Sequence, residues 1–172
     1  MKLDLGSGYI KRKGYLSVDI DSNVDPDIVA DIRYLDPIKS SSADEIFTSH
    51  TLEHVSNTDL FKTLRTFHRV LKPTGKLTII VPDVHRAAID WSKDKIDYRK
   101  FDSVVMGGNP DATPFQLHRN IFSDVKLIRY LLITGFTNID VIYDDKNYEL
   151  VSTAYKPKRN GNAKFKATRR NR

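Results

Sequence analysis

The chain has 172 residues, of which 40% are hydrophobic and none is cysteine. This length suffices for one α/β domain and is short for two, so we expect a single active site. The lack of cysteine excludes disulfides, thiolate metal ligands and cysteine nucleophiles. No apolar run approaches the roughly 18 residues of a membrane span, and residues 1–6 lack the long apolar stretch of a signal peptide. We therefore expect a soluble, cytoplasmic protein with no membrane partner.

The net charge of +6 is concentrated at one end of the chain. Eight of the 28 basic residues and no acidic residue fall in 156–172, which leaves 20 basic against 22 acidic residues elsewhere. A basic segment with little apolar content cannot bury enough surface to offset its ordering entropy. We therefore predict one folded domain over 1–155 and a disordered tail over 156–172. The tail is either a solubilising end or a contact surface for a polyanion such as RNA or DNA.

Short apolar or β-branched runs predict strands at Leu3–Leu5, Leu16–Ile20, Ile28–Ile32, Glu45–Thr48, Lys76–Val81, Asn138–Tyr143 and Leu150–Tyr155. Apolar residues at three- and four-residue spacing predict a helix that begins near Ser56 and stops before Pro73. A second helix is expected between Ser123, a good N-cap, and Gly135. The segment 84–122 is long for a connection, which is typical of functional loops.

Strands that alternate with helices predict a doubly wound, Rossmann-like α/β fold in three layers, with helices on both faces of a mostly parallel sheet. The expected sheet has seven strands. Only six residues separate Tyr143 from Leu150, which is too few for a crossover helix. We therefore expect the last two strands to pair as an antiparallel hairpin.

Polar residues stand at four consecutive strand ends, and the parallel sheet would bring these ends to one crevice, where ligands bind. The residues are Asp4 with Gly6, Ser7 and Gly8, then Asp19, then Asp31, then Ser49 and His50. A carboxylate such as Asp19 can accept hydrogen bonds from both hydroxyls of a ribose. The dinucleotide fingerprint would require a glycine at Lys11, so an NAD enzyme is disfavoured and an adenosine ligand is favoured. Each Asp taken alone can equally be a turn or helix cap.

Together these segments resemble the class I methyltransferases, which use S-adenosylmethionine. The resemblance rests on Leu3–Gly8, Val18–Ile20, Ala30–Ile32, Ser49–Val55, Arg69–Lys76 and Gly135-Phe136. It implies a cofactor site formed by Asp4, Gly6, Ser7 and Gly8 around the methionine part, Asp19 and Ile20 at the ribose, Asp31 and Ile32 at the adenine, and Ser49 and His50 beside the sulfonium. Only 14 residues separate Asp4 from Asp19, so the first helix of the fold is expected to be short or irregular.

A sulfonium carries its own leaving group, so such an enzyme aligns the acceptor for in-line attack, excludes water and removes a proton where needed. No metal is required for this chemistry. His118, in the long segment before the second helix, is the first candidate for the base, and Asp83 at the end of the fifth strand is the second. His118 can instead be a loop histidine bonded to backbone, and Asp83 can be a cap. We expect His54 to orient the turn after the fourth strand.

Three functions stay open on the sequence alone. A methyltransferase for a small molecule or glycan is favoured because the body of the chain is mildly acidic. A nucleic-acid or protein methyltransferase that captures its substrate through 156–172 is the second, and a non-catalytic module that kept the fold is the third. Four aromatic residues of the long segment either line an acceptor pocket or pack against one another, namely Trp91, Tyr98, Phe101 and Phe115. The sequence indicates neither the acceptor atom nor the oligomeric state.

Overall fold

The computed structural model describes residues 1–107, 117–158 and 167–171. Its strands are β1 (Lys2–Leu5), β2 (Leu16–Asp19), β3 (Ile28–Val29), β4 (Ala43–Ser49), β5 (Leu71–Pro82), β6 (Thr137–Asp144), β7 (Glu149–Tyr155) and β8 (Ala167–Asn171). Its helices are α1 (Leu60–Val70), α2 (Val84–Trp91), α3 (Tyr98–Met106) and α4 (Asp124–Ile133), with 3-10 turns at Ser22–Val24 and Leu52–His54. None of the described helices combines the length and apolar character needed to cross a membrane.

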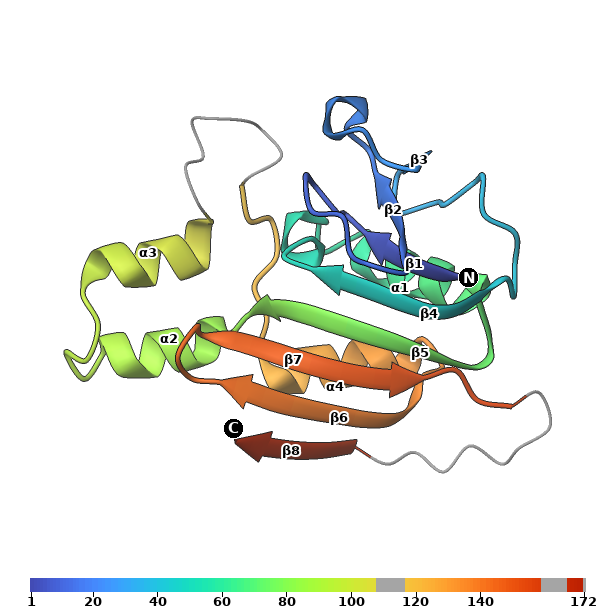
Figure 1. The fold of residues 1–172 in the computed structure, drawn as a ribbon. Coiled ribbons are helices and arrows are strands. Elements are labelled where there is room, and N and C mark those ends of the chain that lie inside the picture. The colour runs from blue at the N-terminus through green and yellow to red at the C-terminus, as the bar shows by residue number, and fades with distance from the viewer. Residues whose placement is uncertain (108–116, 159–166, 172) are drawn as a thin grey trace.

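The strands form one sheet in the order β3-β2-β1-β4-β5-β7-β6-β8 (Figure 1). The pairs from β3 through β5 are parallel, whereas β7 runs antiparallel to both β5 and β6. All seven predicted strands are present at or near their predicted residues. The Rossmann-like α/β fold and the antiparallel hairpin of the sequence analysis are therefore confirmed.

An eighth strand, β8, comes from the segment that was expected to be disordered. It pairs parallel with β6, with Ile139 opposite Ala167 and Tyr143 opposite Asn171. An edge strand is held mainly by backbone hydrogen bonds, so it needs little of the apolar content on which the prediction of disorder rested. Residues 159–166 and 172 of that segment lie outside the described part of the chain.

The helical cover differs from the three layers that were expected. Figure 1 shows α1 and α4 behind the sheet on the same face, and no helix of the described residues lies across the opposite face. With right-handed crossovers, that second layer would have to come from the connections after β1 and β2. The first of these connections turns at Gly6, Gly8 and Gly14, all with positive φ, which suits turns and not helices. The short or irregular first helix that was expected is therefore absent, and residues 6–15 form turns instead.

Helix α1 packs on the sheet through a fully buried apolar stripe that includes Leu60, Leu64 and Phe67. The helix begins four residues after the predicted Ser56, because Ser56 forms a turn instead. Its hydroxyl donates to the Asp59 carboxylate at 2.9 Å and accepts from the Asp59 amide at 3.2 Å. This turn fixes the direction in which the chain leaves the carboxyl end of β4.

Helix α4 has the predicted boundaries. The Ser123 hydroxyl accepts from the Lys126 amide at 3.3 Å, and Gly135 ends the helix with a φ of +100°. A Cβ at Gly135 would lie 3.3 Å from His68 Nε2, so the absence of a side chain there lets α4 and α1 approach each other. Phe136 then contacts the His68 ring edge-on at 5.2 Å, which joins the two helices on one face of the sheet.

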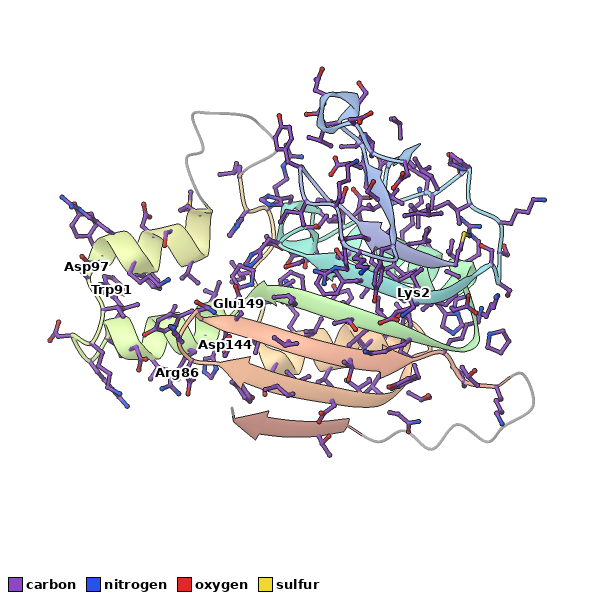
Figure 2. All side chains as sticks on the ribbon, viewed as in Figure 1. Lys2, Arg86, Trp91, Asp97, Asp144 and Glu149 are labelled. Atoms are coloured by element: carbon purple, nitrogen blue, oxygen red, sulfur yellow. The ribbon has the colours of Figure 1, made fainter. Side chains whose placement is uncertain are left out.

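The long connection after β5 contains α2 and α3, which extend beyond the carboxyl ends of β4 and β5 (Figure 1). Figure 2 shows Trp91 and Asp97 at this end of the molecule, far from Lys2. The Trp91 and Phe101 rings stack with centroids 4.4 Å apart, so these two aromatics pack α2 against α3. Tyr98 is 66% exposed, and Phe115 lies outside the described residues.

Candidate functional site

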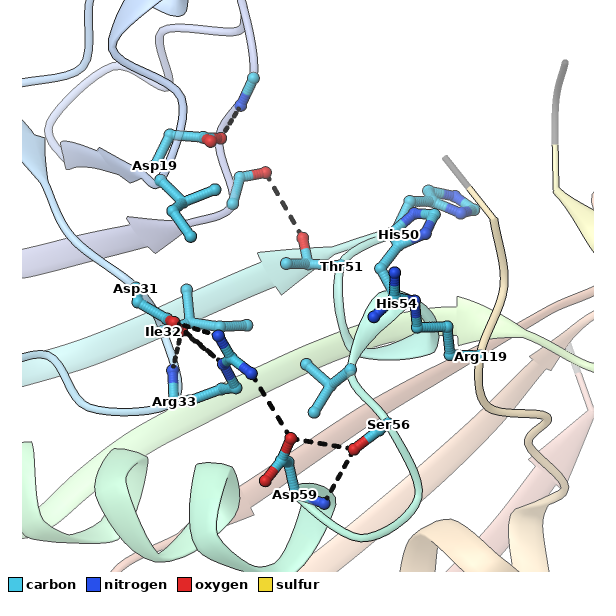
Figure 3. A pocket seen from close by; sticks show the side chains of 14 residues that line it. Asp19, Asp31, Ile32, Arg33, His50, Thr51, His54, Ser56, Asp59 and Arg119 are labelled. Atoms are coloured by element: carbon cyan, nitrogen blue, oxygen red, sulfur yellow. Dashed lines mark hydrogen bonds and ion pairs between the residues drawn. The ribbon is translucent and has the colours of Figure 1, made fainter. Parts of the chain in front are cut away.

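A cavity of about 300 Å³ lies at the carboxyl ends of β1, β2 and β4, where the sequence predicted a ligand crevice. Figure 3 shows it from close by. The lining residues come from the predicted strand ends, from the turn after β4 and from one downstream loop. They are Gly6, Gly8, Asp19, Ile20, Asp31, Ile32, Arg33, His50, Thr51, His54, Val55, Ser56, Asp59 and Arg119.

The turn after β1 requires glycine at position 6. Gly6 has a φ of +68°, and a Cβ there would lie 2.3 Å from Thr51 Cγ2. The Thr51 hydroxyl lies within hydrogen-bond distance of the Leu5 and Ser49 carbonyls, at 3.3 and 3.0 Å. The backbones after β1 and β4 are thus held against each other beside the cavity.

Asp19 points into the cavity from the end of β2 (Figure 3). One carboxylate oxygen accepts from the Gly8 amide at 2.8 Å and the other from the Asp21 amide at 3.0 Å. These bonds fix the carboxylate in place, and each oxygen keeps a lone pair for a ligand hydroxyl. The neighbouring Ile20 is 48% exposed and lines the same wall.

Asp31 lines the cavity in a bidentate ion pair with Arg33. The guanidinium atoms Nε and Nη2 donate to the two Asp31 oxygens at 3.1 and 2.6 Å. Burial opposes ionisation here, but the bonds from Arg33 outweigh it and lower the pKa of Asp31. Arg33 also reaches the Asp59 carboxylate at 3.5 Å, so the network in Figure 3 continues to the start of α1. Ile32, which is 8% exposed, adds an apolar side chain to the cavity lining next to Asp31.

Three predicted cofactor residues lie beside this cavity and do not line it. Asp4 is 4% exposed, pairs with Arg12 at 3.4 Å, and has its pKa raised by burial. Ser7 is 7% exposed, and its hydroxyl lies 3.4 Å from the Gly8 carbonyl. The backbone carbonyl of Ser49 accepts a hydrogen bond from the Thr51 hydroxyl. All three support the turns on which the lining residues stand.

His50 stands between this cavity and a second one. It adopts a left-handed conformation, with a φ of +51°, at the end of β4. Its Nδ1 lies 3.3 Å from a Glu53 oxygen and its Nε2 2.9 Å from Glu149 Oε1. Glu53 and then Glu149 raise the pKa of His50 to about 9 against the opposing effect of burial, so the ring carries a positive charge at neutral pH.

The second cavity has a volume of about 340 Å³ and lies between the turn after β4, the helix α3 and the β6–β7 hairpin. Its lining residues include His50 and His54, which also line the first cavity. The others are Glu53, Pro82, Lys100, Ser103, Val104, Gly107, His118, Asn147, Tyr148 and Glu149. Two adjoining cavities with a shared wall suit an enzyme that brings two ligands together.

His118, the first candidate for the base, lines the second cavity. Its side chain is 8% exposed, and its Nδ1 lies 3.2 Å from the Val104 carbonyl oxygen. Burial lowers the pKa of His118, so the ring is neutral at pH 7. Donation from Nδ1 to this carbonyl leaves the Nε2 lone pair facing Glu53 Oε1 at 3.9 Å. Its role as a base stays a prediction.

Asp83 lines neither cavity. It is 3% exposed, and its carboxylate accepts from the Arg86 amide at 3.1 Å, which makes it the N-cap of α2. Burial raises its pKa. The alternative reading of Asp83 as a cap accounts for these contacts, and its catalytic role stays a prediction without support from the geometry.

Several lining residues were not singled out in the sequence. Arg33 follows Ile32 directly, and its partner Asp59 is 26 residues away in the chain. Arg119 and Asn120 donate their amides to the Glu53 carbonyl at 2.7 and 3.0 Å, which brings a distant loop to the turn after β4. The only signal in the sequence is adjacency to motif residues, because pairing across such distances leaves no local pattern.

Residues 4–79 match the model of the methyltransferase-domain family. No curated protein sequence matches this chain. A solved methyltransferase from Methanosarcina mazei is 19% identical with a TM-score of 0.65, over 91% of this chain and 92% of that one. The Burkholderia thailandensis 1,6-didemethyltoxoflavin-N1-methyltransferase, solved with its substrate and S-adenosylhomocysteine, is 17% identical with a TM-score of 0.58, over 91% of this chain and 70% of that one.

The CurJ carbon methyltransferase structure is 15% identical with a TM-score of 0.61, over 91% of this chain and 48% of that one. The present chain therefore spans about half the length of that protein. At these identities the solved structures establish the fold, and the family match covers a little under half of the chain. Residues 4–79 are thus similar to a methyltransferase domain, and the chain shares the fold of solved S-adenosylmethionine-dependent methyltransferases.

Proposed function

We propose that this chain transfers the methyl group of S-adenosylmethionine directly to a small-molecule or glycan acceptor. The observation that carries the proposal is the pair of cavities that meet at His50 and His54. The first contains the residues that suit an adenosine ligand, and the second contains a neutral imidazole and several polar side chains that suit an acceptor.

In the first cavity, Asp19 binds the ribose hydroxyls, and Asp31 and Ile32 face the adenine. Gly6 and Gly8, supported by Asp4 and Ser7, border the methionine part. His50, which lines both cavities and follows Ser49 at the end of β4, then lies near the sulfonium, and its positive charge is offset by Glu53 and Glu149. This arrangement directs the methyl group towards the acceptor.

In the transfer, an acceptor atom attacks the methyl carbon in line with the carbon–sulfur bond. That bond breaks, its electrons stay on sulfur, and S-adenosylhomocysteine leaves. The acceptor proton passes to Nε2 of His118, which the Val104 carbonyl holds in the required tautomer. The polar side chains of Lys100, Asn147 and Glu149 in the second cavity favour a hydroxylated acceptor. A structural neighbour solved with its small-molecule substrate supports an acceptor of this class.

Calorimetry with S-adenosylmethionine on the parent chain and on Asp19→Ala tests the cofactor site. Loss of charge-assisted hydrogen bonds to two hydroxyls is expected to weaken binding by about 10- to 100-fold. Asp21→Ala is the matched control, because Asp21 lies on the same turn and does not line the cavity. Equal affinity in the parent and Asp19→Ala would contradict the assignment, and no binding by a folded parent would overturn the proposed activity.

A further inference from the structure

Glu53, His54 and His118 meet in the wall of the second cavity. Each offers one oxygen or nitrogen atom, and these atoms lie within 4.8 Å of one another. Glu53 and His54 belong to the 3-10 turn after β4, and His118 belongs to the loop that precedes α4. The Arg119 and Asn120 amides bind the Glu53 carbonyl, so the backbone itself holds the two segments together.

Glu53 is a buried carboxylate with unmet bonding capacity. Its side chain is 1% exposed, and within the described residues neither of its oxygens has a hydrogen-bond partner. Two imidazole nitrogens that can carry a positive charge lie near Glu53 Oε1, at 3.3 Å on His50 and 3.9 Å on His118. A carboxylate removed from water needs a close cation or several donors, and the described residues supply only the His50 ring at a loose distance.

The two histidines of the cluster are oriented as metal ligands are. In both, Nδ1 lies 3.2 Å from a backbone carbonyl oxygen, that of Leu117 for His54 and that of Val104 for His118. A proton on Nδ1 that is donated to a carbonyl leaves Nε2 with a lone pair. Metal-bound histidines in proteins are held by this kind of second hydrogen bond.

We propose that Glu53, His54 and His118 form a binding site for one divalent transition-metal ion such as Zn²⁺, Co²⁺ or Mn²⁺. Two imidazole nitrogens and one carboxylate suit these ions, and three protein ligands leave at least one position open. Bonds of about 2.0–2.2 Å place tetrahedral ligand atoms roughly 3.3–3.6 Å apart. The ligand atoms, which lie within 4.8 Å of one another, would therefore have to close by up to roughly 1.5 Å. Such a shift is small for a histidine or glutamate side chain.

The catalytic role of the ion rests on the proposed function. Because all three side chains line the second cavity, an ion held there would be within reach of an acceptor oxygen, and it would lower the pKa of a hydroxyl that it binds. With the ion bound, Nε2 of His118 is a ligand and no longer takes the proton itself, so the proton of the bound hydroxyl would pass to water. The acceptor class becomes an alcohol or phenol whose oxygen can ligate a metal.

The test is a titration of chelator-treated, dialysed full-length chain with Co²⁺ and with Zn²⁺, followed by calorimetry and by the visible absorption of bound Co²⁺. We expect one ion per chain and a Co²⁺ spectrum of low coordination number. His118→Gln is expected to weaken the affinity at least tenfold. His85→Gln is the matched control, because His85 is exposed and outside the cluster, and it should bind like the parent.

Glu53→Gln provides a second variant in case His118→Gln does not fold. It removes the buried charge without changing the shape of the side chain, so it should fold and lose the ion. No saturable binding by the folded parent would overturn the inference, as would binding that both variants retain.

S-adenosylmethionine calorimetry on the same samples separates the two proposals. A parent that binds the cofactor and no ion retains the proposed function and loses the metal site, with the His50 cation left to neutralise Glu53. A parent that binds the ion and no cofactor retains the metal site and loses the proposed function.

Discussion

Gly6, in the turn after β1 that borders the proposed cofactor site, tolerates little change. In Gly6→Ala the new Cβ meets Thr51 at 2.3 Å, in a backbone conformation that L-residues rarely adopt. The turn has to move away from β4, and we expect a stability loss of about 1–3 kcal/mol and cofactor binding weakened at least tenfold. Thermal melts and calorimetry measure the two effects.

Gly14→Ala is the control for backbone strain alone. Gly14 has a φ of +82° and no atom within 4 Å of an added Cβ, and it does not line the cavity. It should lose some stability and keep its cofactor affinity. Equal loss of affinity in both variants would show that the contact with Thr51 is unimportant.

His68 makes the stability of the fold depend on pH. Burial, followed by the charges of Lys156 and Arg65, lowers the pKa of His68 to about 4, against an ordinary value near 6.5. Between these two values the unfolded chain binds a proton at this ring and the folded chain does not, so stability falls as the pH falls from about 6.5 to 4.

With a discount for partial exposure, we expect His68 to account for about 1–2 kcal/mol across this window. Urea unfolding of the parent and of His68→Gln at several pH values measures it. The variant should show the shallower dependence. Parallel curves would mean that other groups cause the acid sensitivity.

The sequence predicts individual site residues best where a local pattern determines their position. Gly6, Gly8, Asp19 and Ile20 follow strand ends with turn chemistry, and all four line the cavity. Glu53 lies inside the recognised Ser49–Val55 segment, yet its importance depends on His118, which is 65 positions away. No short-range spacing records that contact.

At the scale of elements, α4 depends on its cap. Ser123→Ala removes the acceptor for the Lys126 amide and is expected to cost about 1 kcal/mol. Ser123→Thr keeps an acceptor at the same position and should retain most of the stability. Chemical denaturation of the three chains decides the matter, and an Ala variant as stable as the parent would contradict a capping role.

The pairing of β8 with β6 was not predicted from the sequence, and neither were helices α2 and α3. The backbone register places Asp140 opposite Thr168, and the Thr168 hydroxyl donates to the Asp140 carboxylate at 2.5 Å. A chain that ends at Lys158 is expected to fold, because Lys156 is bound to the body through Thr74 and Gly75. Hydrogen exchange should show faster exchange in β6 and unchanged protection in β5. Unchanged protection of β6 would show that β8 does not pair in solution.

Strands and the two long helices were predictable because burial imposes periods of two and 3.6 residues on their sequences. The arrangement of the helices in layers was less predictable from the sequence. Alternating strands and helices favour cover on both faces, but the glycine turns after β1 leave no helix there, and α1 and α4 share one face. The choice of face is made by packing between segments distant in the chain.

At the scale of the whole molecule, the charge distribution separates two classes of acceptor. A tail that captures RNA, DNA or an acidic protein predicts salt-dependent binding, which truncation after Lys158 would abolish. Our proposal of a small-molecule or glycan acceptor predicts that truncation leaves the acceptor KM within about twofold at 50 and 200 mM salt, where a phosphate-binding tail would differ by orders of magnitude. Kinetics with the full and shortened chains measure this, once an acceptor is known.

The place of β8 at the end of the sheet has a consequence for how molecules behave in concentrated solution. The opposite edge is β3, only two residues long, which offers a neighbouring chain almost nothing to pair with. Without β8, the eight residues of β6 would present an open row of amides and carbonyls to other copies. Shortened chains should therefore self-associate as their concentration rises, whereas the full chain remains dispersed.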